Sequence, residues 1–248
     1  MKPFFLLIVL FCCLAPCAFG LELFKQLKAG AYLRYEHQNQ KSQQTTGFST
    51  LSYKQINHNQ IEERLVNSKP NGEVFQEKTS LFDAAGSLLS YKETDHRSGL
   101  SIVDIYLKNE VKTTLTKGKQ HKELSTRIVD KLVPFEVLTL YLSAHLDSLS
   151  QGNTLSFTLF LPQLGLEFEQ FTQIGVNATK VKQGEVKTPR GIEPFVEVLV
   201  SPTSPLLKML LPAEKSQFRF TYLTNHPRLL FQFSESQTRS TLVKLSAP

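Results

Sequence analysis

Short runs of alternating hydrophobic and polar residues, each ended by turn-forming residues, fill most of this chain. Between residues 30 and 130 the runs recur roughly every eight to twelve residues. Turn sequences such as Lys-Pro-Asn-Gly at 69–72 and Asp-Ala-Ala-Gly at 83–86 separate them. This spacing is typical of neighbouring strands in an antiparallel sheet. The pattern predicts strands at residues 31–37, 48–56, 61–66, 73–82, 88–95, 100–108, 111–117 and 124–130.

One of these runs is apolar on both faces. Ile102 and Tyr106 alternate with Val103, Ile105 and Leu107. A strand that is apolar on both faces is usually covered on both sides. We therefore expect both faces of the sheet to be buried here.

Strands resume after residue 152. The same pattern predicts them at residues 154–161, 168–182, 193–201, 217–223, 228–236 and 240–245. The two blocks are not separated by a linker rich in glycine, serine or proline, and no repeat of fixed period is present. We therefore expect residues 21–248 to form a single β-rich domain.

Between the two blocks, the sequence PFEVLTLYLSAHLDSLS at residues 134–150 predicts a helix. Pro134 suits the first helical turn, and Gly152 suits the position just past the end. At 100° per residue a polar stripe about 80° wide forms along one side. The stripe consists of Glu136, Thr139, Ser143, Asp147 and Ser150.

The rest of this helix is apolar over well over half of its circumference, a wider arc than a surface helix needs. Such a helix must be enclosed on several sides. The predicted fold class is therefore mainly β with one central helix, in which a strongly curved antiparallel sheet, an open or half barrel, wraps around helix 134–150. The polar stripe is expected at the open side of the sheet.

The first twenty residues have the pattern of a secretory signal peptide. Lys2 precedes an apolar run at 4–14, and small residues lead to a cleavage site between Gly20 and Leu21. The run is shorter than the roughly 20 residues of a membrane-spanning helix, although an uncleaved anchor is an alternative. Cys17 follows Leu-Ala-Pro, which resembles a bacterial lipobox with an atypical proline, so lipid anchoring at Cys17 is a second alternative. We expect a periplasmic or secreted protein with no spanning segment after signal removal.

The composition excludes several kinds of site. The three cysteines all lie in the leader, so the mature chain has neither a disulfide nor a thiolate metal site. The net charge is +6, but the basic residues are scattered with few aromatic residues between them. This distribution is typical of a solvated strand face, so we expect no nucleic acid as a partner.

No catalytic signature is present in the sequence. Glu62, Glu63 and Arg64 lie near Tyr35 and its neighbours in the predicted sheet, where carboxylates could serve acid–base chemistry or form a solvated, charge-paired face. The histidines are dispersed and none is paired at metal-ligand spacing. We expect a protein that is not an enzyme, with no metal and no cofactor.

The order of these elements resembles the bacterial DUF3108 family. The resemblance rests on PFEVLTLYL with its closing LSQG, on TLSFTLFLP, and on FTYLTNHPRLLF at 220–231. Glu136 stands where that family usually has Asp, and no Trp precedes the final turn. The family is similar in architecture to the periplasmic lipoprotein carrier and receptor, whose half-barrel sheet encloses a helix and can hold acyl chains. The resemblance implies no catalytic residues.

A second apolar feature is SPTSPLLKMLLP at 201–212, which is either a lid over the mouth of the barrel or a short turn packed in the core. His145 on the helix is likewise either a ligand contact or a core histidine. We expect an envelope protein that holds a lipid, an acyl chain or another apolar ligand between sheet and helix. The alternative is a structural or interaction protein of the envelope, which contacts another envelope protein and has a fully packed core. The candidate ligand-binding residues are Leu138, Tyr141, Leu142, His145, Leu146, Leu207, Met209 and Leu210.

Overall fold

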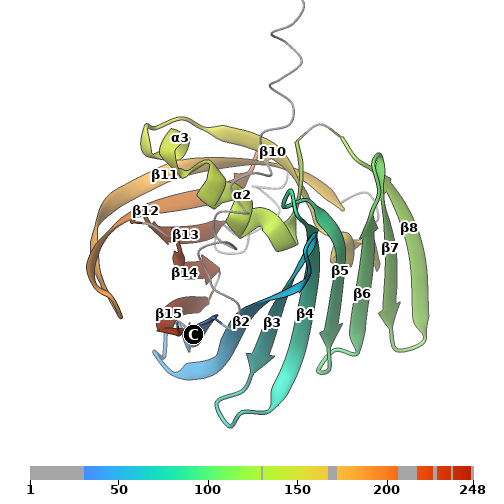
Figure 1. The fold of residues 1–248 in the computed structure, drawn as a ribbon, viewed down its shortest axis with the longest axis horizontal. Coiled ribbons are helices and arrows are strands. Elements are labelled where there is room, and N and C mark those ends of the chain that lie inside the picture. Colours follow the sequence, from blue (N-terminus) through green and yellow to red (C-terminus); the bar gives the residue numbers. More distant parts are fainter. Residues whose placement is uncertain are drawn as a thin grey trace, which may run out of the picture.

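A single sheet runs through the part of the chain that the computed structural model describes, which comprises residues 31–129, 131–166, 172–205, 217–225, 228–235 and 237–246. The sheet has 15 strands in the order β8-β7-β6-β5-β4-β3-β2-β1-β15-β14-β13-β12-β11-β10-β9. Neighbouring strands are antiparallel except β9 and β10, which are parallel. Figure 1 shows the strands curving around a short helical segment. The predicted mainly β fold with one helical segment is therefore confirmed.

The predicted strands all lie within or overlap observed ones. The first block forms β1 (Tyr32–Asn39), β2 (Thr45–Asn57), β3 (Gln60–Ser68), β4 (Val74–Asp83), β5 (Leu88–Asp95), β6 (Leu100–Tyr106), β7 (Glu110–Lys117) and β8 (Gln120–Arg127). The second block forms β9 (Leu132–Pro134), β10 (Leu155–Phe160), β11 (Gln173–Thr188), β12 (Gly191–Pro202), β13 (Phe218–Leu223), β14 (Leu230–Glu235) and β15 (Thr238–Ser246). The helical elements are η2 (Phe135–Val137), α2 (Leu138–Ala144), α3 (Leu146–Ser150) and η3 (Pro162–Leu166).

Glycines with positive φ occupy two of the predicted turns. Gly72 has a φ of +89° and Gly86 a φ of +84°. The backbone N–H of Gly72 donates to the carbonyl of Lys69 over 2.9 Å, and that of Gly86 to the carbonyl of Asp83 over 3.0 Å. A residue with a Cβ atom is strained at such φ values, which explains why both turns contain glycine.

The two edges of the sheet are consecutive in the sequence. Arg127 ends β8 and Leu132 begins β9, so the linking chain spans at most roughly 18 Å. In a flat sheet with this many strands the edges would lie roughly 65 Å apart. The sheet must therefore bend until its edges approach each other. Within the described residues β8 and β9 are not paired with each other, so the sheet is not closed into a barrel.

The short helix η3 packs against the sheet near this opening. Lys122 on β8 donates from Nζ to the carbonyl of Gly165 over 2.8 Å. A Cβ atom at Gly165 would lie only 2.5 Å from Cδ1 of Leu124, so a larger residue would require the Leu124 side chain to shift. Glycine thus permits η3 to pack closely against this edge.

The apolar arc of the helical segment packs against the strands of the second block. Its four buried leucines are 0–1 % exposed and share a core with side chains such as Phe157, Val198 and Phe220. The leucines are Leu138, Leu142, Leu146 and Leu149. The predicted enclosure of this segment is confirmed for these residues.

The helix itself differs from the prediction in three ways. Pro134 belongs to β9, and a 3-10 turn precedes α2. His145 interrupts the helix with a φ of −100° and a ψ of 13°, so α2 and α3 are separate. Its backbone N–H is shared between the carbonyls of Tyr141 and Leu142, and its ring Nδ1 lies 2.9 Å from the Tyr141 carbonyl oxygen. The helix breaks because this bifurcated geometry tightens the last turn of α2.

The prediction that β6 is covered on both faces was wrong. Ile102 is buried on the inner face, but Ile105 and Leu107 on the other face are both 42 % exposed. Part of the surface of most folded proteins is apolar, so an apolar outer face does not require a second layer.

Several predictions concern residues outside the described ranges. They are the signal peptide at 1–20 with its cleavage site at Gly20 and Leu21, the lipid anchor at Cys17, and the apolar run that contains Leu207, Met209 and Leu210. Among the described helices, none has both the length and the apolar character needed to cross a membrane.

Candidate functional site

A cavity of about 800 Å³ lies between the inner face of the sheet and the helical segment. Strands β1–β5 and β13–β15 form its walls, and residues of η2 and α2 form the opposite side. This volume is in the usual range of ligand pockets in proteins. Its apolar lining includes Leu33, Leu51, Leu65, Phe135, Leu138 and Phe233. Its polar lining includes His37, Ser49, Asn67, Gln76 and Lys78.

Strand alternation and register arrange these side chains in rows across the sheet. Every second residue of a strand points to the same face. Ser49, Asn67 and Gln76 are aligned on β2, β3 and β4. The next row along the strands begins with Leu51 and Leu65. On β2 and β3 the cavity therefore has a polar row next to an apolar one, and the second row continues as Lys78 on β4 and Glu93 on β5.

The polar row begins as a chain of hydrogen bonds around His37. Ser49 donates its hydroxyl hydrogen to Oδ1 of Asn67. Because a serine has a single hydroxyl hydrogen, Nε2 of His37, 2.5 Å from Ser49 Oγ, must act as the donor there. Nδ1 of a neutral His37 then accepts from the hydroxyl of Ser240 over 2.6 Å. Burial lowers the pKa of His37, which favours this neutral form.

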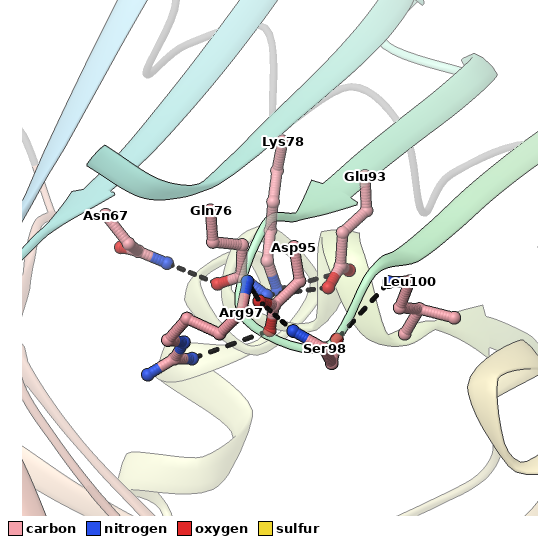
Figure 2. A network of polar contacts seen from close by, with 8 residues as sticks. All are labelled: Asn67, Gln76, Lys78, Glu93, Asp95, Arg97, Ser98 and Leu100. Carbon is pink, nitrogen blue, oxygen red and sulfur yellow. Dashed lines mark hydrogen bonds and ion pairs between the residues drawn. The ribbon is translucent and has the colours of Figure 1, made fainter. Parts of the chain in front are cut away.

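The chain continues to a carboxylate on β5. Nδ2 of Asn67 donates to Oε1 of Gln76 over 2.5 Å, and Nε2 of Gln76 donates to Oε1 of Glu93 over 2.6 Å. The hydroxyl of Tyr91 donates to Oε2 of Glu93 over 2.5 Å, and Nζ of Lys78 lies 3.5 Å from the same oxygen. Figure 2 shows Asn67, Gln76, Lys78 and Glu93 in this network. In this series of hydrogen bonds, from Ser240 to Glu93, every donor points toward Glu93. The negative charge of Glu93 therefore orients all of these hydrogen bonds.

A second polar group lies at the turn between β5 and β6 (Figure 2). Oδ1 of Asp95 accepts the backbone N–H groups of Arg97 and Ser98 over 2.8 and 3.2 Å. Partial burial opposes ionisation of Asp95, but these bonds and the Arg97 guanidinium hold its pKa below the ordinary value. Arg97 lies over the ring of Phe75, 3.8 Å from its centroid. This rim residue is thus held by both Asp95 and Phe75.

Glu136 is the principal departure from the predicted polar stripe. It lines the cavity, as do Thr139 and Ser143, so this half of the stripe faces the interior and not the open side. Oε2 of Glu136 is buried and has no hydrogen-bond partner. Burial, with a smaller contribution from Asp104, raises the pKa of Glu136 to about 8. Only the C-terminal part of the stripe is outside, where Asp147 pairs with Arg228 over 2.7 Å.

Other carboxyl groups around the cavity are also hard to ionise. Burial raises the pKa of Glu63 to about 7, against a hydrogen bond from Tyr53 that lowers it. Burial raises the pKa of Asp104 to about 6, although Thr113 donates to its Oδ1 over 2.5 Å. Burial also raises the pKa of Glu235. The interior therefore favours protonated carboxyl groups.

Replacing Glu136 by glutamine is expected to remove a pH dependence of stability. The folded protein keeps the Glu136 proton up to about pH 8, whereas the unfolded chain loses it near the ordinary value of 4.5. Between these values the folded state binds more protons, so stability falls as pH rises. Chemical unfolding from about pH 5 to about pH 8 should therefore show the wild type losing stability relative to Glu136→Gln.

The control for this measurement is Glu62→Gln. Glu62 neighbours Glu63 on β3 and points to the opposite face of the sheet. The variant Glu62→Gln should therefore show the same pH dependence of stability as the wild type. A stability difference between wild type and Glu136→Gln that is constant over the range would contradict the assignment.

Of the residues predicted to bind a ligand, the structure brings Leu138 to the cavity. Leu142 and Leu146 are enclosed by the strands of the second block. The ring of Tyr141 lies 5.0 Å from that of Phe157 and 4.4 Å from that of His145, so both belong to the helix surroundings and not to the cavity lining. His145 is partly buried, and its Nδ1 lies 2.9 Å from the Tyr141 carbonyl oxygen.

Glu62, Glu63 and Arg64 were predicted from the sequence to lie together in the sheet. The structure separates them, since Glu63 faces the cavity, whereas Arg64 pairs with Glu77 over 3.2 Å on an exposed surface. The residues that sequence reasoning missed are His37, Ser49, Asn67, Gln76 and Glu93. Period-two spacing on the strands was the available signal, but it did not show which strands align. Among the described residues no group of three or more histidine, cysteine or acidic side chains is placed to hold a metal ion.

Comparisons with known proteins do not identify a family. No family model matches the chain, and no curated protein matches it significantly in sequence. The resemblance to DUF3108 therefore stays a prediction.

Two crystal structures are among those that resemble this fold. One is described as a candidate lipoprotein from Parabacteroides distasonis, with a TM-score of 0.38 and 9 % identity, covering 93 % of this chain and 99 % of that one. The other is described as a candidate exported protein with a YmcC-like fold from Bacteroides fragilis, with a TM-score of 0.36 and 6 % identity, covering 88 % of this chain and 96 % of that one. With TM-scores this low, neither likeness bears on what this chain does.

Proposed function

We propose that this chain is an exported protein of the bacterial envelope that binds an amphiphilic molecule in the cavity between its sheet and its helical segment, without catalysing a reaction. The signal-peptide pattern of residues 1–20 and the resemblance to DUF3108 support export. The single observation that carries the proposal is the cavity of about 800 Å³. In this proposal the bent sheet acts as a half barrel that encloses the ligand.

The proposed site lies on a different side of the helix from the one expected from the sequence. Leu142, Leu146 and Leu149 are already covered by the chain's own side chains, so a ligand has no space there. The cavity instead borders the side of η2 and α2 that carries Glu136, Thr139 and Ser143. The hydroxyl of Tyr222 donates to the Thr139 carbonyl over 3.0 Å, which anchors this side to β13.

The lining favours a molecule with both apolar and polar parts. Leu51 and Leu65 provide an apolar wall, where burial of a hydrocarbon chain gains roughly 25 cal/mol per Å². The adjacent row from Ser240 to Glu93 provides fixed polar groups. A purely apolar ligand would remove water from these polar groups without replacing its hydrogen bonds, which costs free energy.

Filling the cavity is expected to abolish ligand binding. Leu65 lines the cavity, so Leu65→Trp should remove volume from its apolar wall. Its neighbour Val66 points to the other face of β3, so Val66→Trp is the matched control. Protein purified from bacteria under native conditions is analysed by native mass spectrometry for co-purified lipid. It is then titrated with a fluorescent alkyl probe.

We expect Leu65→Trp to weaken probe binding by about tenfold or more, which corresponds to about 1.4 kcal/mol, while Val66→Trp binds like the wild type. Equal binding by all three proteins would place the ligand elsewhere. Absence of both co-purified lipid and probe binding in the wild type would contradict the proposal.

An envelope interaction protein is the second candidate. It is favoured by the apolar residues Ile105 and Leu107, which are exposed on the outer side of the sheet. Binding of an envelope partner should persist in Leu65→Trp and be lost when Ile105 and Leu107 are replaced by serine. Cross-linking in intact cells with these variants separates the two functions.

A further inference from the structure

Around the cavity the cationic side chains form ion pairs, whereas several carboxyl groups do not. The cationic side chains in its lining already have carboxylate partners. Lys78 pairs with Glu93 over 3.5 Å, and Arg228 with Asp147 over 2.7 Å. At the rim, Lys69 pairs with Glu73 over 2.7 Å and Arg97 with Asp95 over 3.5 Å.

The carboxyl groups of the lining do not have such partners. Glu63, Glu136 and Glu235 all line the cavity, and within the described residues none of them forms an ion pair. Glu136 contributes a buried oxygen, Oε2, that accepts no hydrogen bond. A buried acceptor without a donor is costly, and a ligand can supply the missing donor. Among the described residues, the lining cations also leave one buried N–H without a partner, Nε of Arg228, but Glu63 and Glu136 have no cation paired with them.

We propose that the molecule bound in this cavity is a cationic amphiphile, an apolar chain that carries a protonated amine, which pairs with Glu136 and Glu63. This inference rests on the proposed function, because it names the chemical class of the ligand of the same cavity. The amine provides a positive charge to both carboxyl groups and an N–H donor to Oε2 of Glu136, which has no hydrogen-bond partner. The alkyl chain lies along the apolar row that contains Leu51 and Leu65.

The surroundings of Glu136 explain why it is available to such a ligand. It is faced by Lys78 on β4, Tyr91 and Glu93 on β5, and Asp104 and Tyr106 on β6. Lys78 is the only cation in this set, and its charge is shared with Glu93, so the excess is acidic. Glu63 is faced by Tyr53 on β2 and Tyr35 on β1, which bring no positive charge.

An anionic amphiphile such as a fatty acid fits this cavity less well. Its carboxylate would have to displace Glu93 from Lys78, or bind beside Asp147 at Arg228, whose Nε is buried without a hydrogen-bond partner. It would also bring a negative charge close to Glu63, Glu136 and Glu235. At pH values where these carboxyl groups are ionised, like charges in the desolvated site repel, so its binding is disfavoured there.

Three probes with the same chain length test the inference: dodecylamine, dodecanol and lauric acid. Each is titrated into the wild-type protein below its critical micelle concentration by isothermal calorimetry. We expect dodecylamine to bind at least about tenfold more tightly than dodecanol, with lauric acid the weakest. The matched variants are Glu136→Gln and Glu63→Gln, with Glu62→Gln on the opposite face of β3 as the control.

Each cavity variant is expected to weaken dodecylamine binding by about tenfold and to leave dodecanol unchanged or slightly stronger, because it removes one anionic partner. The affinity for dodecylamine should rise from about pH 6 to about pH 8, since the carboxyl groups must release their protons to pair with the amine. An alkylamine, like lysine, stays protonated below about pH 10, so the change comes from the protein. Dodecanol should show no such dependence.

The outcomes separate this inference from the proposed function. If the three probes bind equally, or if lauric acid binds best, the cavity takes amphiphiles but the assignment of a cation is wrong. If Glu62→Gln weakens dodecylamine as much as Glu136→Gln, the site is not the cavity. If none of the probes binds to the folded wild type, both the inference and the proposed function fail.

Discussion

Replacing Leu142 by alanine is expected to lower the free energy of unfolding by about 3–5 kcal/mol. Leu142 is 0 % exposed and lies in the core that the helical segment shares with β10–β13. Removing its side chain beyond Cβ costs the transfer free energy of the lost groups and leaves a cavity that the surrounding strands cannot close. Urea unfolding at equilibrium, followed by circular dichroism, measures the loss.

The same substitution at an exposed position is the control. Leu107 is 42 % exposed and follows the last residue of β6, so Leu107→Ala should change the free energy of unfolding by no more than about 0.5 kcal/mol. Equal losses for Leu142→Ala and Leu107→Ala would mean that the sheet does not enclose the helical segment. The proposed cavity would then lose one of its walls.

Glu93→Gln is expected to cost about 2 kcal/mol of stability. The substitution removes the counter-charge of Lys78 and one of the two acceptors that bond Gln76 and Tyr91. Losing one partner of a fully buried ion pair costs about 3–5 kcal/mol. The Lys78 side chain is 25 % exposed and can turn toward water in the cavity, so we expect a smaller loss.

A double variant separates the ion pair from the hydrogen bonds. Lys78→Met in the Glu93→Gln background should cost less than the sum of the two single losses, because the lysine no longer lacks a partner. Glu77→Gln is the matched control on the other face of the sheet. Glu77 is 39 % exposed and its pair with Arg64 is open to solvent, so we expect a loss below about 1 kcal/mol. Equal losses for Glu93→Gln and Glu77→Gln would show that the chain of hydrogen bonds does not stabilise the fold.

The strands were predictable because each carries its own signal. The run that became β10 alternates apolar and polar residues from Leu155 to Leu159 and follows a turn with Gly152, and both features act over a few residues. The enclosure of Leu142 and Leu146 was predictable for the same reason, since the breadth of the apolar arc is a property of one segment. Where the prediction of the helix failed, at Pro134 and His145, contacts of the backbone decided the outcome.

The site was not predictable in this way. His37, Ser49, Asn67 and Gln76 are common polar residues on separate strands, and nothing in any one strand distinguishes them from a solvated face. They form a chain of hydrogen bonds because the register of β1–β4 aligns them on the inner face. A shift of one residue in a single strand would turn its polar residue outward and break the row.

The amino-acid sequence by itself determined which segments become strands and that one amphipathic segment is covered, because alternation and helical spacing are local properties that the hydrophobic effect acts on directly. Only the tertiary structure decided which face of that segment borders the cavity. Glu136 belongs to a stripe that any helix of this composition would turn toward water, yet its carboxyl group lies inside, near Lys78 and Tyr91. The reason is that the inner face of the bent sheet brings together groups from β4, β5 and β6, and their common environment, not the residue type, sets the charge and the pKa of each.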